Sequence, residues 1–106
     1  MNATRNSHLW GALGDGTRLA IVARLADGPL AVGELAAGLP VGRSAVSQHL
    51  KILKDADLVE DVAVGTRRIY RLNPVGLAAL RDQLDTYLQR ALAAYANAVE
   101  APAEKY

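Results

Sequence analysis

Residues 43–54 combine basic and small polar side chains in a pattern suited to contacting double-stranded DNA. On a helix with about 100° per residue, the apolar residues Val46, Leu50 and Leu53 fall within about 60° and form the expected buried stripe. Lys and Arg neutralise phosphates, whereas Ser and Gln reach base edges or phosphate oxygens. We therefore predict that the opposite face enters the major groove, although an ordinary solvated helix face is the alternative. This polar face consists of Arg43, Ser44, Ser47, Gln48, Lys51 and Lys54.

A second basic segment, residues 65–71, carries Arg67, Arg68 and Arg71. It and residues 43–54 each carry a charge of +3 without any acid, although the whole chain has a net charge of only +1. Positive charge gathered on one surface attracts duplex DNA, and the release of counterions then supplies affinity. We predict that Arg67 and Arg68 contact DNA. The alternative is a solvated hairpin tip whose charges prevent edge-to-edge pairing.

The residue types exclude several other chemistries. The chain has no Cys, so disulfides, Cys-ligated zinc and iron–sulfur clusters are excluded. Its two histidines, His8 and His49, belong to different predicted helices, and no Gly-rich phosphate loop accompanies them. We predict that the protein is not an enzyme and has no cofactor. His49 lies at the margin of the buried stripe, where a structural role is favoured over a DNA contact, with both left open.

Two carboxylates of the last predicted helix raise the question of a metal site. Asp82 and Asp85 are three residues apart and could share a hard cation, but two carboxylates alone make a weak site. The favoured interpretation is that both are solvated. We predict no bound metal.

Gly and Pro residues divide the chain into short elements. The pattern predicts helices over 7–13, 16–26, 32–38, 43–56 and 74–99, with Leu19, Val22 and Leu25 as the apolar face of the second helix. Alternation predicts strands at Val59–Val62 and Arg67–Leu72, with 63–66 as their turn. Two helices joined by a tight turn outline a helix-turn-helix, and the hairpin outlines a wing. The predicted fold is mainly α with one β-hairpin.

Length and composition agree with one domain over residues 1–106, with 1–6 and 101–106 as flexible tails. The chain is 51% hydrophobic and 22% charged, which is typical of a globular protein. No apolar run approaches the ~18 residues of a membrane span, and the N-terminus lacks the apolar stretch of a signal peptide. We therefore expect a cytoplasmic protein without a membrane partner.

The last predicted helix carries an apolar stripe longer than the other helices can cover. We predict that part of it pairs with a second subunit, whereas entirely intramolecular packing is the alternative. Two-fold pairing would set two copies of helix 43–56 about 34–36 Å apart, so we expect a palindromic operator. The predicted dimer interface consists of Leu9, Trp10, Leu84, Tyr87, Leu88, Leu92 and Tyr95.

Four segments of the chain carry a family resemblance: Ala12–Arg18, Gly33–Ala36, Ser44–Leu53 and Gly65–Leu72. In their order and spacing they resemble the ArsR family of bacterial winged-helix repressors over about residues 8–92. The resemblance implies a homodimeric regulator of α-α-α-α-β-β-α order whose fourth helix enters the major groove and whose hairpin tip contacts the flanking DNA. It places Ser44, Ser47, Gln48 and Lys51 at the family's reading positions, and Arg67 and Arg68 on its wing.

This sequence departs from the metal-sensing members of that family. Their third-helix site uses cysteines, whereas Gly33–Gly38 contains no ligand pair, and residues 74–100 contain no His for a last-helix site. We therefore expect a repressor that occludes its promoter without sensing a metal, located in the bacterial cytoplasm and held at the nucleoid by DNA. The sequence assigns it no small-molecule effector. The alternative function is a winged-helix protein-interaction module that does not bind DNA.

Overall fold

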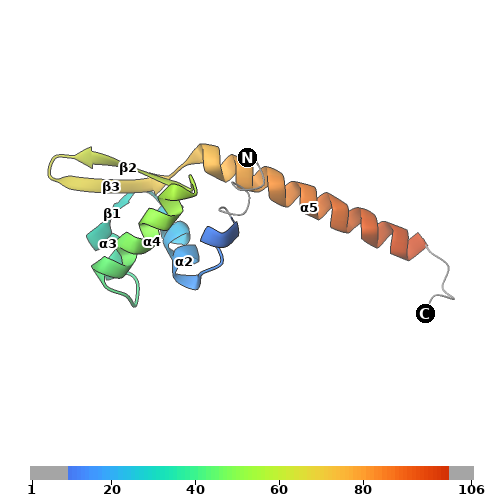
Figure 1. Cartoon of the computed structure of the whole chain (residues 1–106), viewed down its shortest axis with the longest axis horizontal. Helices are drawn as coiled ribbons and strands as arrows, with labels where there is room; N and C mark the ends of the chain where they lie inside the picture. The colour runs from blue at the N-terminus through green and yellow to red at the C-terminus, as the bar shows by residue number, and fades with distance from the viewer. Residues whose placement is uncertain (1–9, 101–106) are drawn as a thin grey trace.

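The structure is a computed structural model, and it describes residues 10–100 (Figure 1). A short helical segment at 10–12 comes first, and a three-stranded antiparallel sheet packs with the helices that follow. The fold is therefore the predicted helix-turn-helix with a wing. Its elements are α2 (Gly16–Leu25), β1 (Leu30–Ala31), α3 (Val32–Ala37), α4 (Arg43–Asp55), β2 (Val59–Val64), β3 (Arg67–Leu72) and α5 (Pro74–Glu100).

The hairpin is longer than predicted at its turn. β2 continues to Val64, which pairs with Arg67 of β3, so the turn is Gly65–Thr66 and not 63–66. Gly65 has φ +64°, a left-handed conformation that two-residue hairpin turns require and that glycine adopts without a steric penalty. The tight turn brings Arg67 and Arg68 to the end of the wing.

The sequence analysis missed β1. Its two residues pair antiparallel with β3, with Leu30 opposite Tyr70 and Ala31 opposite Ile69, giving the strand order β1-β3-β2. A two-residue strand is too short to show any alternation, so only the tertiary pairing defines it. β1 leads directly into α3 and therefore places the start of that helix beside the wing.

The hydrophobic core lies among α2, α3, α4 and the sheet. The predicted stripe of α4 is confirmed, since Val46, Leu50 and Leu53 are fully buried. The predicted face of α2 is partly wrong: Leu19 is 51% exposed, and Ile21 is the fully buried residue. Ile21 and Leu25 form an i, i+4 pair on the inner side of the helix, and position 19 lies about 200° from position 21. The buried core is Ala12, Ile21, Leu25, Leu35, Val46, Leu50, Leu53, Ala56, Leu58 and Val59.

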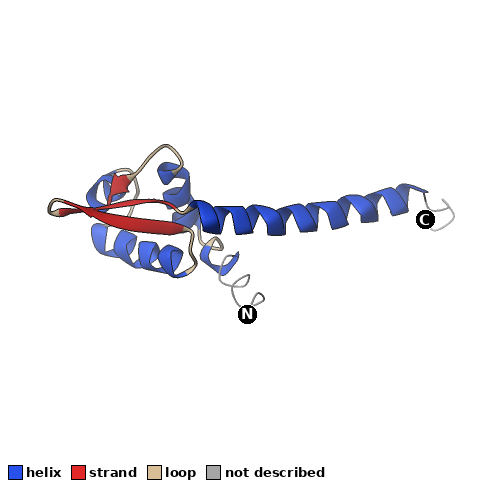
Figure 2. Ribbon diagram, turned by 90° about the horizontal axis from the view of Figure 1, so that it is seen from above, coloured by secondary structure: helices blue, strands red, loops and turns tan. Residues whose placement is uncertain are grey.

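A close backbone contact sets the direction in which α5 leaves the body. A Cβ on Gly76 would overlap the carbonyl group of Asp57 in the turn between α4 and β2. Before it, the Asn73 side chain caps the helix by accepting a hydrogen bond from the Val75 backbone N–H at 3.0 Å. α5 then runs outward away from the other elements (Figures 1 and 2). None of the described helices is long and apolar enough to cross a membrane.

Candidate nucleic-acid interface

The polar face of α4 points outward as predicted. All of its residues (Arg43, Ser44, Ser47, Gln48, Lys51 and Lys54) are exposed. The helix begins at Arg43, after the tight turn that follows α3, and its opposite side is held in the core. Because the buried stripe fixes the rotation of α4 about its axis, the six polar side chains are presented together to solvent.

The hairpin register places two of its arginines on opposite faces. In a strand, successive side chains point to opposite sides, so Arg67 and Arg68 diverge. Arg68 donates to the Asp61 carboxylate at 2.6 Å, and Lys54 Nζ lies 2.7 Å from the other oxygen of the same carboxylate. The Asp61 side chain is only 4% exposed. Arg68 therefore lies on the side of the wing that faces α4, and Asp61 joins the helix to the hairpin.

The ionisation of Asp61 and Lys54 reflects this contact. Hydrogen bonds from Lys54 and then Arg68 hold the pKa of the Asp61 carboxyl below its ordinary value of 3.8. The same carboxylate raises the pKa of Lys54 above 10.5. Asp61 and Lys54 are therefore both charged at neutral pH, and the bridge between α4 and the wing is an ionic one.

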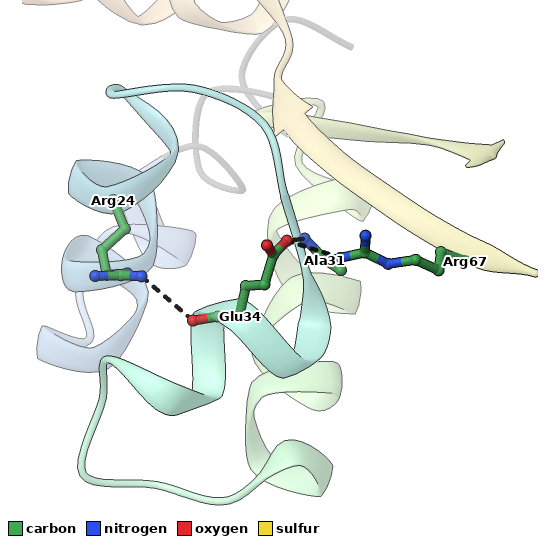
Figure 3. Close-up of polar contacts among 4 residues, drawn as sticks. All are labelled: Arg24, Ala31, Glu34 and Arg67. Carbon is green, nitrogen blue, oxygen red and sulfur yellow. Dashed lines mark hydrogen bonds and ion pairs between the residues drawn. The ribbon is translucent and has the colours of Figure 1, made fainter.

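Arg67 makes a different contact, with α3. Its guanidinium donates to Glu34 Oε1 at 3.0 Å, and the same oxygen accepts a hydrogen bond from the Ala31 backbone N–H at 2.8 Å (Figure 3). The Ala31 hydrogen bond is the main reason that the pKa of Glu34 lies below its ordinary value, with the Arg67 charge also lowering it. On the other side, Arg24 donates to the Glu34 backbone carbonyl at 3.2 Å. Glu34 thus ties β1, α3 and the wing together.

Because of these contacts, most cations of the basic surface are paired with carboxylates, which the charge count along the sequence does not show. Of the six cations in the two basic segments, five have a carboxylate oxygen within 3.3 Å: Lys51, Lys54, Arg67, Arg68 and Arg71. Among the residues that the structure describes, Arg43 is the sixth and has no carboxylate partner. The paired cations remain more than half exposed, so they can still contact phosphates.

Sequence reasoning missed Glu34 and Asp61 as members of this surface. Asp61 could be found only once the observed hairpin register is known, because Asp61 lies opposite Tyr70 and diagonal to Arg68. Glu34 could not, because it reaches Arg67 only through the unpredicted pairing of β1 with β3.

A cleft of about 430 Å³ lies between the start of α3 and the wing. Three arginines contribute to its lining: Arg43 from α4, with Arg67 and Arg68 from β3. Arg43 lies across Gly33, since its guanidinium carbon would be 3.7 Å from a Cβ at that position. We call this feature the arginine cleft. Its full lining is Ala31, Val32, Gly33, Glu34, Arg43, Thr66, Arg67 and Arg68.

His49 faces the body of the protein. Its Nδ1 lies 3.2 Å from Arg18 NH1 of α2, and because a guanidinium only donates, Nδ1 is the acceptor of this hydrogen bond. Arg18 also donates to the Ala12 carbonyl at 2.6 Å. The contact agrees with the structural role favoured for His49, because it links α4 to α2 and to the short helical segment at 10–12.

The predicted dimer face lies mostly along the outward part of α5. Trp10 packs against Tyr87 with ring centroids 6.1 Å apart and an interplanar angle of 51°, so the predicted association of the first helical segment with this stripe is present. Leu9 falls outside the described residues. The apolar side chains of this stripe are exposed from Leu84 to the end of the helix: Leu84, Tyr87, Leu88, Leu92, Tyr95 and Val99.

Residues 10–100 contain no group of three or more His, Cys, Asp or Glu side chains placed to hold a metal ion. Asp82 and Asp85 are both exposed on α5. The tertiary structure brings no further ligand to this pair within the described chain.

The chain is similar in sequence to known transcriptional regulators. Residues 13–62 match the model of a helix-turn-helix domain family. The chain is 65% identical over 91 residues to the HTH-type transcriptional regulator Rv2034 of Mycobacterium tuberculosis, covering 86% of this chain and 85% of the relative. It is 31% identical over 82 residues to the transcriptional repressor SdpR of Bacillus subtilis, covering 77% and 88% of the two chains.

A solved structure extends the likeness to the whole winged fold. It is the homodimeric winged helix-turn-helix DNA-binding domain of a possible ArsR-family transcriptional regulator from Mycobacterium bovis. The two structures align with a TM-score of 0.67 and 30% identity, over 83% of this chain and 85% of that one.

Proposed function

The chain belongs to the ArsR family of winged helix-turn-helix transcriptional regulators, and from this premise we propose that it is a homodimeric repressor that occludes a promoter by binding a palindromic operator. As a member of this family it is a DNA-binding regulator and not an enzyme. We propose the mode of DNA binding, the residues that contact DNA, the dimer interface and the absence of metal sensing.

The observation that carries the proposal is the joint exposure of the polar face of α4 and the end of the wing. Ser44, Ser47 and Gln48 carry short hydrogen-bonding groups in the middle of the α4 face, where base edges would lie. The exposed cations of the same face can contact phosphates, which positions the helix without specifying sequence. These phosphate contacts are assigned to Arg43, Lys51, Lys54, Arg67 and Arg68.

The proposed dimer forms through α5. An outward helix with a row of exposed apolar side chains is costly in water, and a second copy of the same helix would cover it. Trp10 extends this face through its contact with Tyr87. The solved relative from Mycobacterium bovis is homodimeric, which supports the same assembly here.

We further propose that the regulator acts without a metal. No Cys is present, and no set of three ligands is assembled among residues 10–100. Repression is favoured because SdpR, one of the similar regulators, is a repressor. Binding over a promoter would then be sufficient to block transcription.

A gel-shift titration with the DNA upstream of the protein's own gene tests the proposal. A regulator should shift this DNA and lose affinity steeply between about 50 and 200 mM salt, because phosphate contacts release counterions. Footprinting of the same DNA should protect two half-sites about one helical turn apart. A protein-interaction module would give no shift at any salt concentration, and that result would refute the proposal.

A further inference from the structure

We propose that the arginine cleft binds one backbone phosphate of DNA, and that Glu34 is the intramolecular anion that this phosphate displaces from Arg67. The inference rests on the proposed DNA binding and extends it to a specific exchange. In the free protein the Glu34 carboxylate binds the Arg67 guanidinium. In the complex a DNA phosphate binds this guanidinium instead. Glu34 would therefore limit the affinity of the protein for any DNA, whatever its sequence.

The lining of the cleft suits a phosphodiester group. Three arginines contribute to its lining, and Arg is the side chain whose planar set of donors matches phosphate oxygens best. Arg43 has no carboxylate partner among the described residues, so its guanidinium is available without breaking an ion pair. The Arg43 guanidinium lies over Gly33 at the start of α3, within van der Waals distance of where a Cβ would be, and this places it beside the cleft.

The Arg67–Glu34 contact has the properties of an exchangeable pair. Both side chains are more than half exposed, at 57% and 51%, so each can be rehydrated when the contact opens. Exposed ion pairs contribute little to stability for this reason. Glu34 also keeps its hydrogen bond from the Ala31 backbone N–H, so the carboxylate does not depend on Arg67 for its position. A phosphate can therefore replace Glu34 as the ion-pair partner of Arg67 at a small cost in free energy.

The neighbouring Arg68–Asp61 contact behaves differently. The Asp61 side chain is only 4% exposed and is shared between Arg68 and Lys54, so a phosphate would have to draw Arg68 away from a carboxylate that two cations hold. The two arginines at the end of the wing thus have separate roles. Arg67 exchanges its partner for DNA, whereas Arg68 stays paired and contributes its charge from a fixed position.

The test compares two matched variants, Glu34→Gln and Glu60→Gln. Each removes one negative charge and one arginine pair, but Glu60 pairs with Arg71 at 2.8 Å and does not line the cleft. In E34Q the side-chain amide oxygen can still accept the Ala31 hydrogen bond. Affinity for a random-sequence duplex is measured at several salt concentrations, with thermal unfolding of each variant as a check on folding. We expect E34Q to bind about threefold or more tightly than E60Q, since the competing carboxylate is gone only in E34Q.

An Arg67→Ala background shows whether the gain acts through that arginine. The E34Q gain should disappear when Arg67 is absent, and R67A alone should lower the salt dependence by about one phosphate contact. Equal gains in E34Q and E60Q, or a gain that persists in the R67A background, would overturn the inference. If a variant does not fold, the NMR signal of the Arg67 Nε–H group in the wild type provides the test instead. This signal should shift when the protein is saturated with the duplex. An unshifted signal would overturn the inference.

The two proposals fail in different ways. If the wild type binds no DNA at any salt concentration, the proposed function is wrong. If the wild type binds DNA with the expected salt dependence but the two variants behave alike, only the exchange at Glu34 is wrong.

Discussion

Lys54 of α4 and Asp61 of β2 lie 2.7 Å apart, nitrogen to oxygen, and join the helix with the outward polar face to the wing. The Asp61 carboxylate also accepts from Arg68, so one nearly buried acid serves both basic segments. The contact fixes the relative position of the two surfaces that are proposed to straddle DNA. The contact stabilises the free protein, and it holds α4 and the wing in place before any DNA is bound.

Replacing Asp61 by Asn should lower the free energy of unfolding by about 1–2 kcal/mol. The variant keeps the shape of the side chain but loses two charged hydrogen bonds, which are stronger than neutral ones. Chemical denaturation measures the change. Asp55→Asn is the control, because the Lys51–Asp55 pair is exposed on both sides and its loss should leave the unfolding curve unchanged. Equal effects of the two substitutions would show that Asp61 is not a structural link.

The contribution of Asp61 should depend on pH in acid. Hydrogen bonds from Lys54 and Arg68 hold its pKa in the folded state below 3.8, so the folded protein binds this proton less readily than the unfolded chain. The stabilisation is therefore fully present above about pH 4 and is lost as the pH falls through the folded-state pKa. The difference in unfolding free energy between wild type and D61N should be constant from about pH 5 to 8 and should narrow in more acidic solution. A constant difference throughout would contradict the lowered pKa.

Substituting Gln48 by Ala should weaken operator binding by about 1–3 kcal/mol and relax sequence preference at one base pair. Gln48 is exposed on the polar face of α4 and carries both a donor and an acceptor for a base edge. The measurement is a pair of titrations, one with the operator and one with random DNA. If both lose affinity equally, Gln48 contacts the DNA backbone and does not select the sequence.

Leu88→Asp should convert the proposed dimer into monomers. Leu88 is 49% exposed on the outward part of α5, and a charge there would be buried without a partner when two subunits meet. Sedimentation measures the change in mass. Val75→Asp is the matched control: Val75 is 71% exposed on the same helix but in its first turn, away from the stripe. A variant L88D that sediments as the wild type does would show that the stripe is not the interface.

Gly76→Ala should destabilise the fold by about 1–3 kcal/mol, because the added Cβ would overlap the Asp57 carbonyl and force α5 away from the α4–β2 turn. Gly16→Ala is the control, since nothing lies within 4 Å of a Cβ there and Ala favours the helix. Thermal unfolding of both variants measures the difference. Similar melting temperatures would rule out a tight contact at Gly76.

Much of this architecture follows from local pattern. The helical period over residues 43–54 separates Val46, Leu50 and Leu53 from the polar residues, and the structure confirms that separation residue by residue. The strand predicted at Arg67–Leu72 and the Asn73–Pro74 start of α5 are equally local, and the bounds of the strand and the start of the helix match the structure. Such features are predictable because hydrophobic burial and capping act on residues that are close together in sequence.

The sequence by itself determined the helices, the two strands of the hairpin, the outward face of α4 and the concentration of arginines near one hairpin turn. The tertiary structure alone decided which acids meet those arginines. Glu34 reaches Arg67 because β1 pairs with β3, and Asp61 reaches Lys54 because the hairpin folds back along α4. These contacts join residues that are up to 33 positions apart, so their partners depend on strand pairing and on how the elements pack together. A charge count along the chain cannot contain that information, because ion pairs form through space.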